Sequence, residues 1–340
     1  QRMSTPIDFP PPSSGLAARV AVRARRAPQA LATVLLDGRG QTEREVTAAD
    51  LHRAAGAGAQ WLAGQDVPRG ACVLVSSQDS LVFLAGFLAC LYHGAVAVPL
   101  PVPTPRRGGD RMAAVAADCT LVAAFSDTTS AERIAQALAG EHVAMPPQCD
   151  PWLLPGLDRE PVTASLDDLA FIQYTSGSTG VPRGVEITLA NLVDNLEMIR
   201  NAFQHGPHDV GLGWLPPYHD MGLVGLLLQP LWCGFPVHLM PPLAFVQNPL
   251  AWWRAASRLK ATVTGGPCFS FDLSVQAARA GSLAGLDLSH LRLLFSGAEP
   301  IRAASVRALL DSGTPPDASA LSAIGYRECV QVLAGQMSLE

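Results

Sequence analysis

The stretch YTSGSTGVPRGV, residues 174–185, decides the fold. It follows the apolar run LAFIQYT, which predicts a buried strand. It precedes LANLVDNLEMIRNAF (189–203), whose periodicity predicts an amphipathic helix capped by Thr188 or Asn191. Its Ser, Thr and Gly residues can turn several backbone N–H groups and hydroxyls toward one concave space, and Arg183 adds one positive charge. The stretch therefore predicts a phosphate-binding loop on an α/β framework.

A nucleotide-kinase P-loop is the rival motif, and it needs the spacing G-x-x-x-x-G-K-[ST]. Gly180 and Gly184 are four residues apart, and no Lys-Ser or Lys-Thr pair follows either glycine. A flexible linker is the other alternative, but a strand before the loop and a helix after it anchor both of its ends. The sequence therefore favours a phosphate loop of another kind.

Strands and helices alternate along the rest of the chain. The runs 48–64, 110–119 and 131–140 predict helices, and ACVLVSS, TLVAAFS and ATVTGG predict strands. The run LSHLRLLFSG predicts a short helix that leads into a strand. Such alternation implies mostly parallel sheets wrapped by helices, so we expect an α/β fold.

Two uncharged runs, 80–100 and 221–240, are each long enough to be compared with a membrane span. Both break in the middle at a glycine-containing cluster and resume as a short β-branched run that ends at proline. A helix, a tight glycine turn and a buried parallel strand produce this pattern without lipid. We therefore expect no membrane span.

Composition narrows the class of protein. Hydrophobic residues make up 49% of the chain and charged residues 16%, which describes a globular domain with a sizeable core. The formal charge of -5 and the scattered arginines disfavour a nucleic-acid partner. None of the seven cysteines forms a Cys-x-x-Cys pair, which favours the reduced cytoplasm over a zinc site. His205-x-x-His208 reads as a solvated turn rather than a metal site, and residues 1–14 as a flexible lead-in rather than a signal peptide.

YTSGSTGVPRGV resembles the phosphate loop of the adenylate-forming superfamily, which includes acyl-CoA ligases, luciferases and peptide-synthetase adenylation domains. Further stretches resemble its later motifs in the required order: WLPPYHDMGLVG (214–225), FSGAEPIR (295–302) and IGYREC (324–329). YHDMGL, SGAEP and residues 90–119 look most like fatty acyl-AMP ligases. The resemblance implies a truncated N-terminal domain over 15–340, with two mostly parallel sheets wrapped by helices. One subdomain would span about 50–203 and the other about 15–49 plus 204–340.

The resemblance also implies an activity. A fatty-acid carboxylate would attack the α-phosphate of ATP, with Mg²⁺ as cofactor, to give acyl-AMP and pyrophosphate. The acyl group would then pass to an acyl carrier protein of a polyketide, lipid or peptide synthase. Two alternatives stay open: an acyl-CoA ligase, and a catalytically silent domain that binds acyl ligands or partners.

Site residues are carried over from the matching motifs. Arg183, His219 and Glu328 would be catalytic, with Glu328 also holding Mg²⁺. The expected nucleotide-binding residues are Thr175, Ser176, Gly177, Ser178, Thr179, Gly180, Gly184, Gly297, Ala298, Glu299 and Gly325. The expected acyl-binding residues are Trp214, Tyr218, Asp220, Met221, Gly222, Pro267, Cys268 and Phe269. The last three lie in GGPCFSFDL, which resembles the family's acyl-pocket strand, and Leu223, Val224 and Leu226 are candidates for the tunnel lining.

The chain departs from the family pattern in several places. Arg183 stands where the family has lysine, and Lys260 is the single lysine among 24 basic residues. Ile324 stands where the adenine-stacking tyrosine belongs. The Phe-Asp-x-Ser signature of amino-acid activation occurs only at 271–274, after the tunnel motif. This position does not fit the signature's place in the family, so it does not indicate an amino-acid substrate. The family's small β-barrel and its C-terminal lid with a catalytic lysine would follow later, so we expect a fragment with little activity of its own.

Overall fold

The structure is a computed structural model that describes residues 9–104, 109–176, 182–280 and 285–311. The chain divides into two compact units. Unit 1 comprises Gln1–Pro6, Leu31–Val46 and Asp194–Glu340, and unit 2 comprises Ile7–Ala30 and Thr47–Val193. Every strand of the described residues belongs to one of two six-stranded sheets. The predicted α/β architecture is therefore confirmed.

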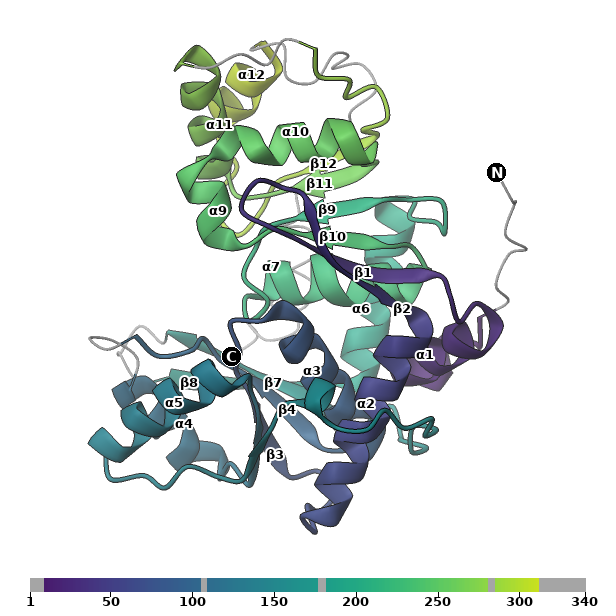
Figure 1. Ribbon diagram of the computed structural model, residues 1–340, viewed down its shortest axis with the longest axis vertical. Coiled ribbons are helices and arrows are strands. Elements are labelled where there is room, and N and C mark those ends of the chain that lie inside the picture. The colour runs from purple at the N-terminus through teal and green to yellow at the C-terminus, as the bar shows by residue number, and fades with distance from the viewer. Residues whose placement is uncertain (1–8, 105–108, 177–181, 281–284, 312–340) are drawn as a thin grey trace, which may run out of the picture. The chain divides into compact units, whose positions relative to one another are not determined.

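Unit 2 is built around the sheet of order β6-β5-β3-β4-β7-β8. Its elements are η1 (Pro12–Ser14), α1 (Gly15–Arg26), α2 (Ala48–Gly64), β3 (Cys72–Val75), α3 (Ser80–His93), β4 (Val96–Pro99), α4 (Gly109–Cys119), β5 (Ala123–Phe125), α5 (Thr128–Gly140), β6 (Gln148–Cys149), η2 (Pro151–Leu153), β7 (Leu169–Ser176) and β8 (Pro182–Thr188). Neighbouring strands are parallel except β7 and β8, which form an antiparallel hairpin. Helices α4 and α5 lie on one side of the sheet and α2 and α3 on the other (Figure 1).

Local sequence signals explain these helices. Thr47 and Asp50 form a reciprocal capping box at the start of α2, and Asp79 accepts from two backbone N–H groups at the start of α3. The apolar run 80–100 is α3, a left-handed Gly94 with φ 82° and the buried strand β4, as predicted. Among the described residues, no helix has the length and apolar character that crossing a membrane requires.

Unit 1 holds the sheet of order β12-β11-β9-β10-β1-β2. Its elements are β1 (Leu31–Leu36), β2 (Thr42–Thr47), α6 (Leu189–Ala202, which begins in unit 2), β9 (Gly211–Gly213), α7 (Asp220–Gly222), the π-helix η3 (Leu223–Leu228), α8 (Gln229–Cys233), β10 (Val237–Leu239), α9 (Pro242–Gln247), α10 (Pro249–Leu259), β11 (Val263–Gly265), α11 (Cys268–Ala280), β12 (Leu293–Phe295) and α12 (Ala303–Asp311). Thr188 caps α6 by exchanging hydrogen bonds with Asn191.

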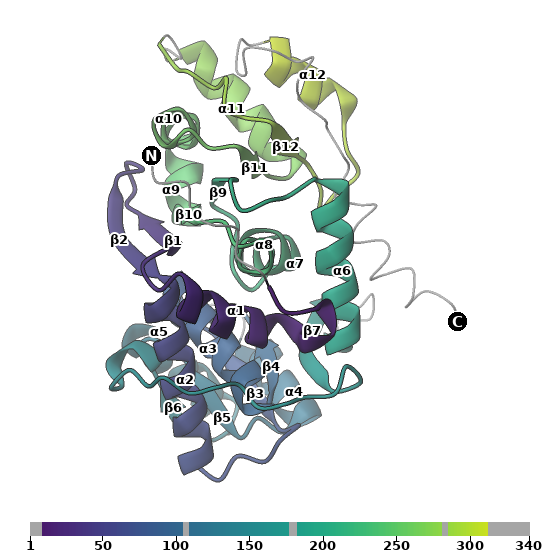
Figure 2. The same ribbon diagram turned by 90° about the vertical axis from the view of Figure 1, so that its right-hand side faces the viewer.

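The strands β1, β10, β9, β11 and β12 are all parallel. They therefore begin at one edge of the sheet, which we call the amino edge, and end at the other, the carboxyl edge. Helices α10 and α11, beside β11 and β12 in Figure 2, share a buried apolar cluster with these strands. In open parallel sheets, ligands bind outside the carboxyl ends of the strands, so the carboxyl edge is the place to look for a site.

Three expectations need correction. Cys268 and Phe269 do not lie on a strand, because β11 ends at Gly265 and α11 begins at Cys268. The short helix expected directly before β12 is not found in the described residues 285–292, because the Asp287 carboxylate accepts from the backbone and hydroxyl of Ser289 and holds a turn there. Residues 15–30 belong to unit 2, not to the unit that contains 204–311, because α1 packs its buried face on α2.

Candidate functional site

The β7–β8 hairpin of unit 2 carries the predicted phosphate loop. Its strands pair from Leu169↔Thr188 to Ser176↔Pro182, with Thr175 opposite Arg183. Both Thr175 and Arg183 are exposed at the end of the hairpin. Of the predicted phosphate-binding residues, Gly177, Ser178, Thr179 and Gly180 lie outside the described residues. The described part therefore places one hydroxyl residue and the one cation side by side at the base of the loop.

Gly184 has a packing role at this base. It pairs with Tyr174, and a Cβ on Gly184 would lie 3.0 Å from Cζ of the Tyr174 ring and 2.9 Å from the Ile172 side chain. Both neighbours are buried, so neither has free space to yield into. Glycine is required here because the Tyr174 ring covers it, a cross-strand arrangement that stabilises glycine in sheets.

At the carboxyl edge of unit 1, the strand ends approach each other closely. Met240 donates its N–H to Gly213 O over 2.8 Å, and Gly266 donates to Phe295 O over 3.1 Å. A Cβ on Gly265 would lie 2.3 Å from the Phe295 carbonyl oxygen, which is part of the backbone. The glycines at these strand ends therefore permit contacts that a larger residue would prevent.

The predicted acyl-site motif begins at this edge, directly after β9. Trp214 is buried and stacks on Phe245, with ring centroids 3.9 Å apart, while the exposed Phe269 meets the Trp214 ring edge-on at 6.0 Å. Within the part of the chain that is described, Nε1 of Trp214 has no hydrogen-bond partner. The structure thus brings Trp214 and Phe269 together, as expected, although Phe269 comes from a helix.

His219 and Asp220 form a polar pair at the start of α7. Nδ1 of His219 lies 2.7 Å from Oδ1 of Asp220, and the two side chains are 49% and 41% exposed. The hydrogen bond to Asp220 raises the pKa of His219. Burial acts to raise the pKa of Asp220, but the contact with His219 and the hydrogen bond from the Met221 N–H together outweigh it and lower that pKa overall. Asp220 is therefore already neutralised by a neighbour when His219 is protonated.

The residues after this pair are apolar and buried. Gly222 packs so tightly that a Cβ would lie 2.1 Å from the Pro216 carbonyl oxygen, which fixes the turn. Met221, Leu223, Val224 and Leu226 are all buried, and Leu223–Leu228 forms a π-helix. Such helices frequently mark functional sites. Tyr218 lies before the turn, half-buried, and burial raises the pKa of its hydroxyl.

The predicted adenine motif follows β12 at the same edge. Ala298 has φ +66°, a left-handed conformation that is strained for a residue with a Cβ. Glu299 accepts from the N–H of Phe269 over 3.1 Å, so its carboxylate caps the N-terminus of α11. Cys268 is buried, with Sγ 3.7 Å from the Ser296 hydroxyl, and it accepts from the backbone N–H of Arg302. Pro267 accepts from both the N–H and the hydroxyl of Ser270.

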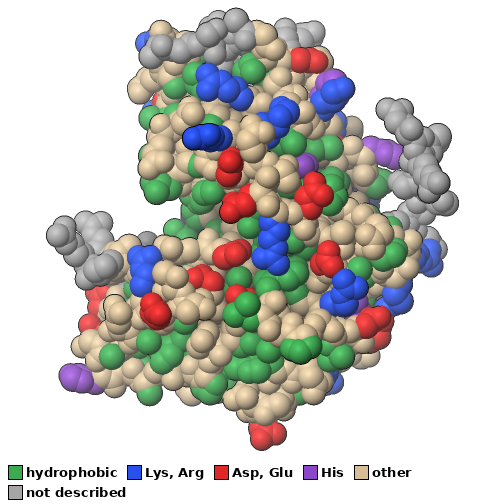
Figure 3. All heavy atoms as spheres, in the orientation of Figure 1, with side chains coloured by type: hydrophobic (Ala, Val, Ile, Leu, Met, Phe, Trp, Pro, Cys, Tyr) green, Lys and Arg blue, Asp and Glu red, His purple; other side chains and the backbone are tan. Residues whose placement is uncertain are grey.

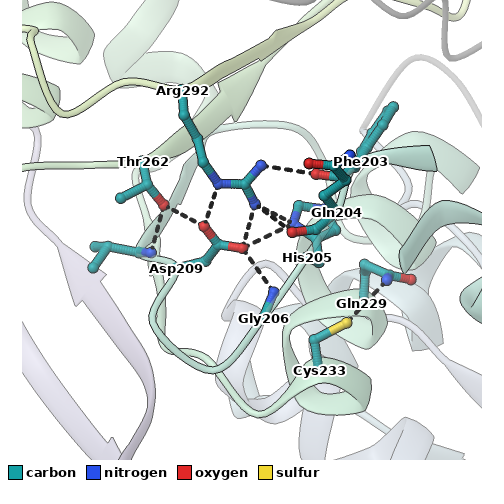
Figure 4. Close-up of polar contacts among 10 residues, drawn as sticks. Phe203, Gln204, His205, Gly206, Asp209, Gln229, Cys233, Thr262 and Arg292 are labelled. Atoms are coloured by element: carbon teal, nitrogen blue, oxygen red, sulfur yellow. Dashed lines mark hydrogen bonds and ion pairs between the residues drawn. The ribbon is translucent and has the colours of Figure 1, made fainter. Parts of the chain in front are cut away.

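The amino edge of unit 1 carries a polar network that the sequence did not reveal (Figure 4). The buried Asp209 accepts from Nε and Nη2 of Arg292, with Nε 2.8 Å from Oδ1. It also accepts from the Thr262 hydroxyl at 2.8 Å and the Gly206 N–H at 3.0 Å, and Nδ1 of His205 lies 3.2 Å away. Burial alone raises the pKa of Asp209, but these hydrogen bonds outweigh it and hold the pKa well below the usual range.

The sequence signal for this network was available. Asp209, Thr262 and Arg292 each stand one or two residues before a strand, so parallel strands bring them to one edge. The expectation of a solvated turn at His205-x-x-His208 is wrong for His205, which is a buried member of this network, whereas His208 is exposed. The Nη1 group of Arg292 also donates to Phe203 O over 2.8 Å, which ties the segment after α6 to β12.

Three other predicted residues, Gly325, Glu328 and Ile324, lie outside the described residues. On the face drawn in Figure 3, both basic and acidic side chains of the described residues are present, with Lys and Arg the more frequent in the upper part of the view.

Comparisons with known proteins identify the family and the fold. Residues 20–336 match the family model described as AMP-binding enzyme. The chain is 46% identical over 144 residues to the medium-chain-fatty-acid–[acyl-carrier-protein] ligase TtuA of Teredinibacter turnerae. The aligned segment covers 42% of this chain and 22% of TtuA. It is 33% identical over 285 residues to the probable long-chain-fatty-acid–AMP ligase FadD30 of Mycobacterium tuberculosis, covering 80% of this chain and 48% of FadD30.

A solved structure is also similar. The fatty acyl-adenylate ligase from L. pneumophila, in complex with acyl adenylate and pyrophosphate, has a TM-score of 0.80 at 30% identity, covering 88% of this chain and 52% of that one. The chain thus spans about half or less of the length of these relatives. The family match covers nearly all of the chain and the fold agrees with it, so the chain belongs to the AMP-binding enzyme family, with fatty acyl-AMP ligases among its relatives.

Proposed function

We propose that the protein activates a fatty acid with ATP, forming acyl-AMP and pyrophosphate, and passes the acyl group to an acyl carrier protein in the cytoplasm. The observation that carries the proposal is the buried apolar segment Met221–Leu228, which follows His219 and Asp220 at the carboxyl edge of unit 1. The names of TtuA and FadD30 support the same substrate class and, for TtuA, the same acceptor.

An amino-acid substrate fits this segment poorly. Its ammonium group needs a free carboxylate, and the only described carboxylate within the segment 214–228 is Asp220, which His219 already contacts at 2.7 Å. A buried unpaired charge costs several kcal/mol, on the order of 2 or more. A fatty acid carries no such charge, and each methylene it buries contributes about 0.8 kcal/mol. Affinity is therefore expected to rise with chain length until the apolar segment is covered.

The nucleotide would use the other predicted groups. Within unit 2, the β7–β8 hairpin offers Thr175 and Arg183 to phosphate oxygens. Arginine is suited to phosphate because its planar fork can donate two parallel hydrogen bonds. Mg²⁺ belongs to the proposal through Glu328, a carboxylate of the kind that this hard cation prefers. The cytoplasmic assignment is supported by the six described cysteines, all of which are free thiols.

The test is fatty-acid-dependent exchange of labelled pyrophosphate into ATP by the whole protein. The panel contains fatty acids from hexanoate to palmitate and the twenty amino acids. We expect exchange with medium or long fatty acids, and loss of most of it in Arg183→Ala, because a charge-assisted contact is worth about 1.5–3 kcal/mol. A preference for any amino acid over dodecanoate would reject the substrate class.

Two further measurements test the acyl acceptor and the alternative of a catalytically silent acyl-binding domain. Transfer of labelled acyl groups from acyl-AMP to a phosphopantetheinylated carrier protein is compared with transfer to free coenzyme A. Faster transfer to coenzyme A would replace the carrier-protein assignment by an acyl-CoA ligase. Tight binding of fatty acid by calorimetry with no exchange under any condition would identify a silent acyl-binding domain.

A further inference from the structure

Helix α4 of unit 2 contacts the residue that precedes the phosphate loop at two separate points. Nη2 of Arg111 donates to the backbone carbonyl of Tyr174 over 3.0 Å. The Tyr174 hydroxyl donates to the Asp118 carboxylate over 2.6 Å. The Tyr174 side chain is only 4% exposed, and Thr175 follows it directly. One helix therefore holds both the backbone and the tip of the same tyrosine.

The spacing on α4 makes this possible. Arg111 and Asp118 are seven residues apart, which is two helical turns, so they lie on the same face of the helix. Val115, four residues after Arg111, is fully buried in the cluster that also contains Ile172 and Tyr174. The face of α4 that packs on the sheet therefore also carries the two polar contacts.

The outer end of the hairpin needs this support. Strand β7 pairs with its parallel neighbour β4 at Ala97↔Phe171. Its pairing with β8 extends further along β7, to Ser176↔Pro182. Strand β4 itself ends at Pro99. Residues 174–176 thus extend past β4 and have β8 as their strand neighbour. A two-stranded ribbon is marginally stable by itself, and α4 supplies the missing contacts.

Tyr174 transmits this support to the facing strand. Its ring lies over Gly184, which is the residue next to Arg183. Burial and the hydrogen bond to Asp118 raise the pKa of the Tyr174 hydroxyl, so it remains a protonated donor at neutral pH. A shift of Tyr174 would therefore displace both Thr175 on its own strand and Arg183 opposite.

We propose that Arg111 and Asp118 are positioning residues for nucleotide binding, which act through Tyr174 to fix Thr175 and Arg183 at the end of the hairpin. This inference rests on the proposed function, because it takes ATP phosphates as the ligand of the hairpin. Neither residue touches the nucleotide in this assignment. Their effect is on the geometry of the two groups that do.

The first measurement uses the full chain without ligand. Hydrogen exchange is followed at the backbone amides of Thr175 and Arg183 in the wild type, Arg111→Met, Tyr174→Phe and Asp118→Ala. The matched control is Tyr92→Phe, which removes a buried hydroxyl of the same unit that lies 2.8 Å from Nδ1 of His52, away from the hairpin. We expect exchange at the hairpin to rise at least about fivefold in the first three variants and to stay unchanged in Tyr92→Phe.

The second measurement is ATP affinity by calorimetry on the same proteins. We expect Arg111→Met and Tyr174→Phe to weaken ATP binding about 5- to 20-fold. This is the range expected for the loss of one hydrogen bond that involves a charged group. Arg111→Lys and Asp118→Asn should restore most of the affinity, because each keeps a donor or an acceptor. Tyr92→Phe should lower the melting temperature as much as Tyr174→Phe and leave ATP affinity intact.

The outcomes separate the two proposals. If Tyr174→Phe and Tyr92→Phe lower the melting temperature alike while hairpin exchange and ATP affinity stay at wild-type values, α4 is an ordinary structural helix and the positioning role is overturned. If the wild type fails to bind ATP, the proposed function and the ligand assigned to the hairpin fail together. Hydrogen exchange would still decide in that case whether α4 holds the hairpin.

Discussion

The amino and carboxyl edges of the unit 1 sheet are made by the same strands and yet are built in opposite ways. At the amino edge, Asp209 is buried and accepts from Arg292, Thr262 and Gly206 (Figure 4). At the carboxyl edge, the Trp214 Nε1 group has no partner in the described part of the chain, and Ala298 is held at φ +66°. The carboxylate at the amino edge is thus fully hydrogen-bonded, whereas a buried donor at the carboxyl edge is not.

This difference separates stability from ligand binding. A buried charge that is fully hydrogen-bonded can hold strand starts together, but it has no capacity left for a ligand. An unpaired donor and strained backbone cost stability, and functional sites are where such features tend to persist. Substitutions at the two edges should therefore affect different measurements.

The largest effect is expected at the amino edge. Asp209→Asn removes the charge that pairs with Arg292 and leaves the guanidinium partly buried, so we expect a loss of about 3–5 kcal/mol in the free energy of unfolding. Urea denaturation followed by tryptophan fluorescence measures it, because Trp214, Trp252 and Trp253 lie in the unit 1 core. The matched control is Asp272→Asn, which breaks the exposed pair with Arg302 and should cost at most about 1 kcal/mol.

Equal losses in these two variants would contradict the comparison, because the Arg292–Asp209 pair would then contribute no more than a surface ion pair. A loss in Asp209→Asn that appears only as weaker ATP binding would reverse the roles of the two edges.

Acid should remove the contribution of Asp209. Its pKa in the folded protein lies below the unfolded value of about 3.9, so its contribution to stability is fully present above that pH and is lost as pH falls through the folded-state pKa. The stability difference between wild type and Asp209→Asn should therefore be constant from pH 7 to about 5 and shrink below about pH 4. Denaturation curves at pH 7, 5, 4 and 3 measure this, and a difference that grows toward acid would exclude a depressed pKa.

Glycine substitutions test the close approach at the carboxyl edge. Gly265→Ala places a Cβ 2.3 Å from the Phe295 carbonyl oxygen, so we expect a loss of about 1–3 kcal/mol from overpacking. Gly206→Ala at the amino edge meets no atom within 4 Å and keeps the N–H that Asp209 accepts, so we expect no loss and a gain of up to about 1 kcal/mol. Thermal unfolding by calorimetry compares them, and similar melting temperatures would mean that the strand ends have room to separate.

The smallest effect is expected at Ala298. Glycine adopts φ +66° without strain, and the gain from Ala298→Gly should be at most about 1 kcal/mol because glycine also stabilises the unfolded chain by entropy. Ala303→Gly, at the exposed start of α12, should instead lose about 0.5–1 kcal/mol. A loss of stability in Ala298→Gly would show that the left-handed turn after β12 carries no strain.

Much of the fold could be predicted from the residues that begin and end helices and strands. The run 80–100 was correctly divided into helix, glycine turn and strand because Gly94 interrupts an apolar pattern that only a covered parallel strand continues. The strand before the phosphate-loop motif was correctly predicted as LAFIQYT, which lies in β7, but strand β8 (Pro182–Thr188), which pairs Arg183 with Thr175, was expected to be loop. Such features depend on neighbours in the chain.

The features that were missed depend on distant residues. Asp209 and Arg292 are 83 residues apart, and each reads alone as an ordinary charge before a strand. The stretch after Pro267 was taken for a strand, but Glu299, 30 residues later, caps it as a helix. The helix over 110–119 was predicted, but nothing in its sequence indicates that Arg111 and Asp118 both contact Tyr174, more than 50 residues later. Pairings of this kind are set by topology, which local pattern does not contain.

The pairing of β1 with β10 joins two strands that are made at different times during synthesis of the chain. Thr33 lies opposite Val237, so the first strand of the unit 1 sheet is synthesised roughly 200 residues before its partner, a delay on the order of 10–40 s at about 5–20 residues per second. During that time Val34 and Leu36, both buried in the finished sheet, have no strand β10 to cover them. The strands of unit 2 are complete by Thr188, so its sheet can form first. Chaperone binding to the nascent chain is therefore expected to centre on residues 31–36 and to end once residue 239 has left the ribosome.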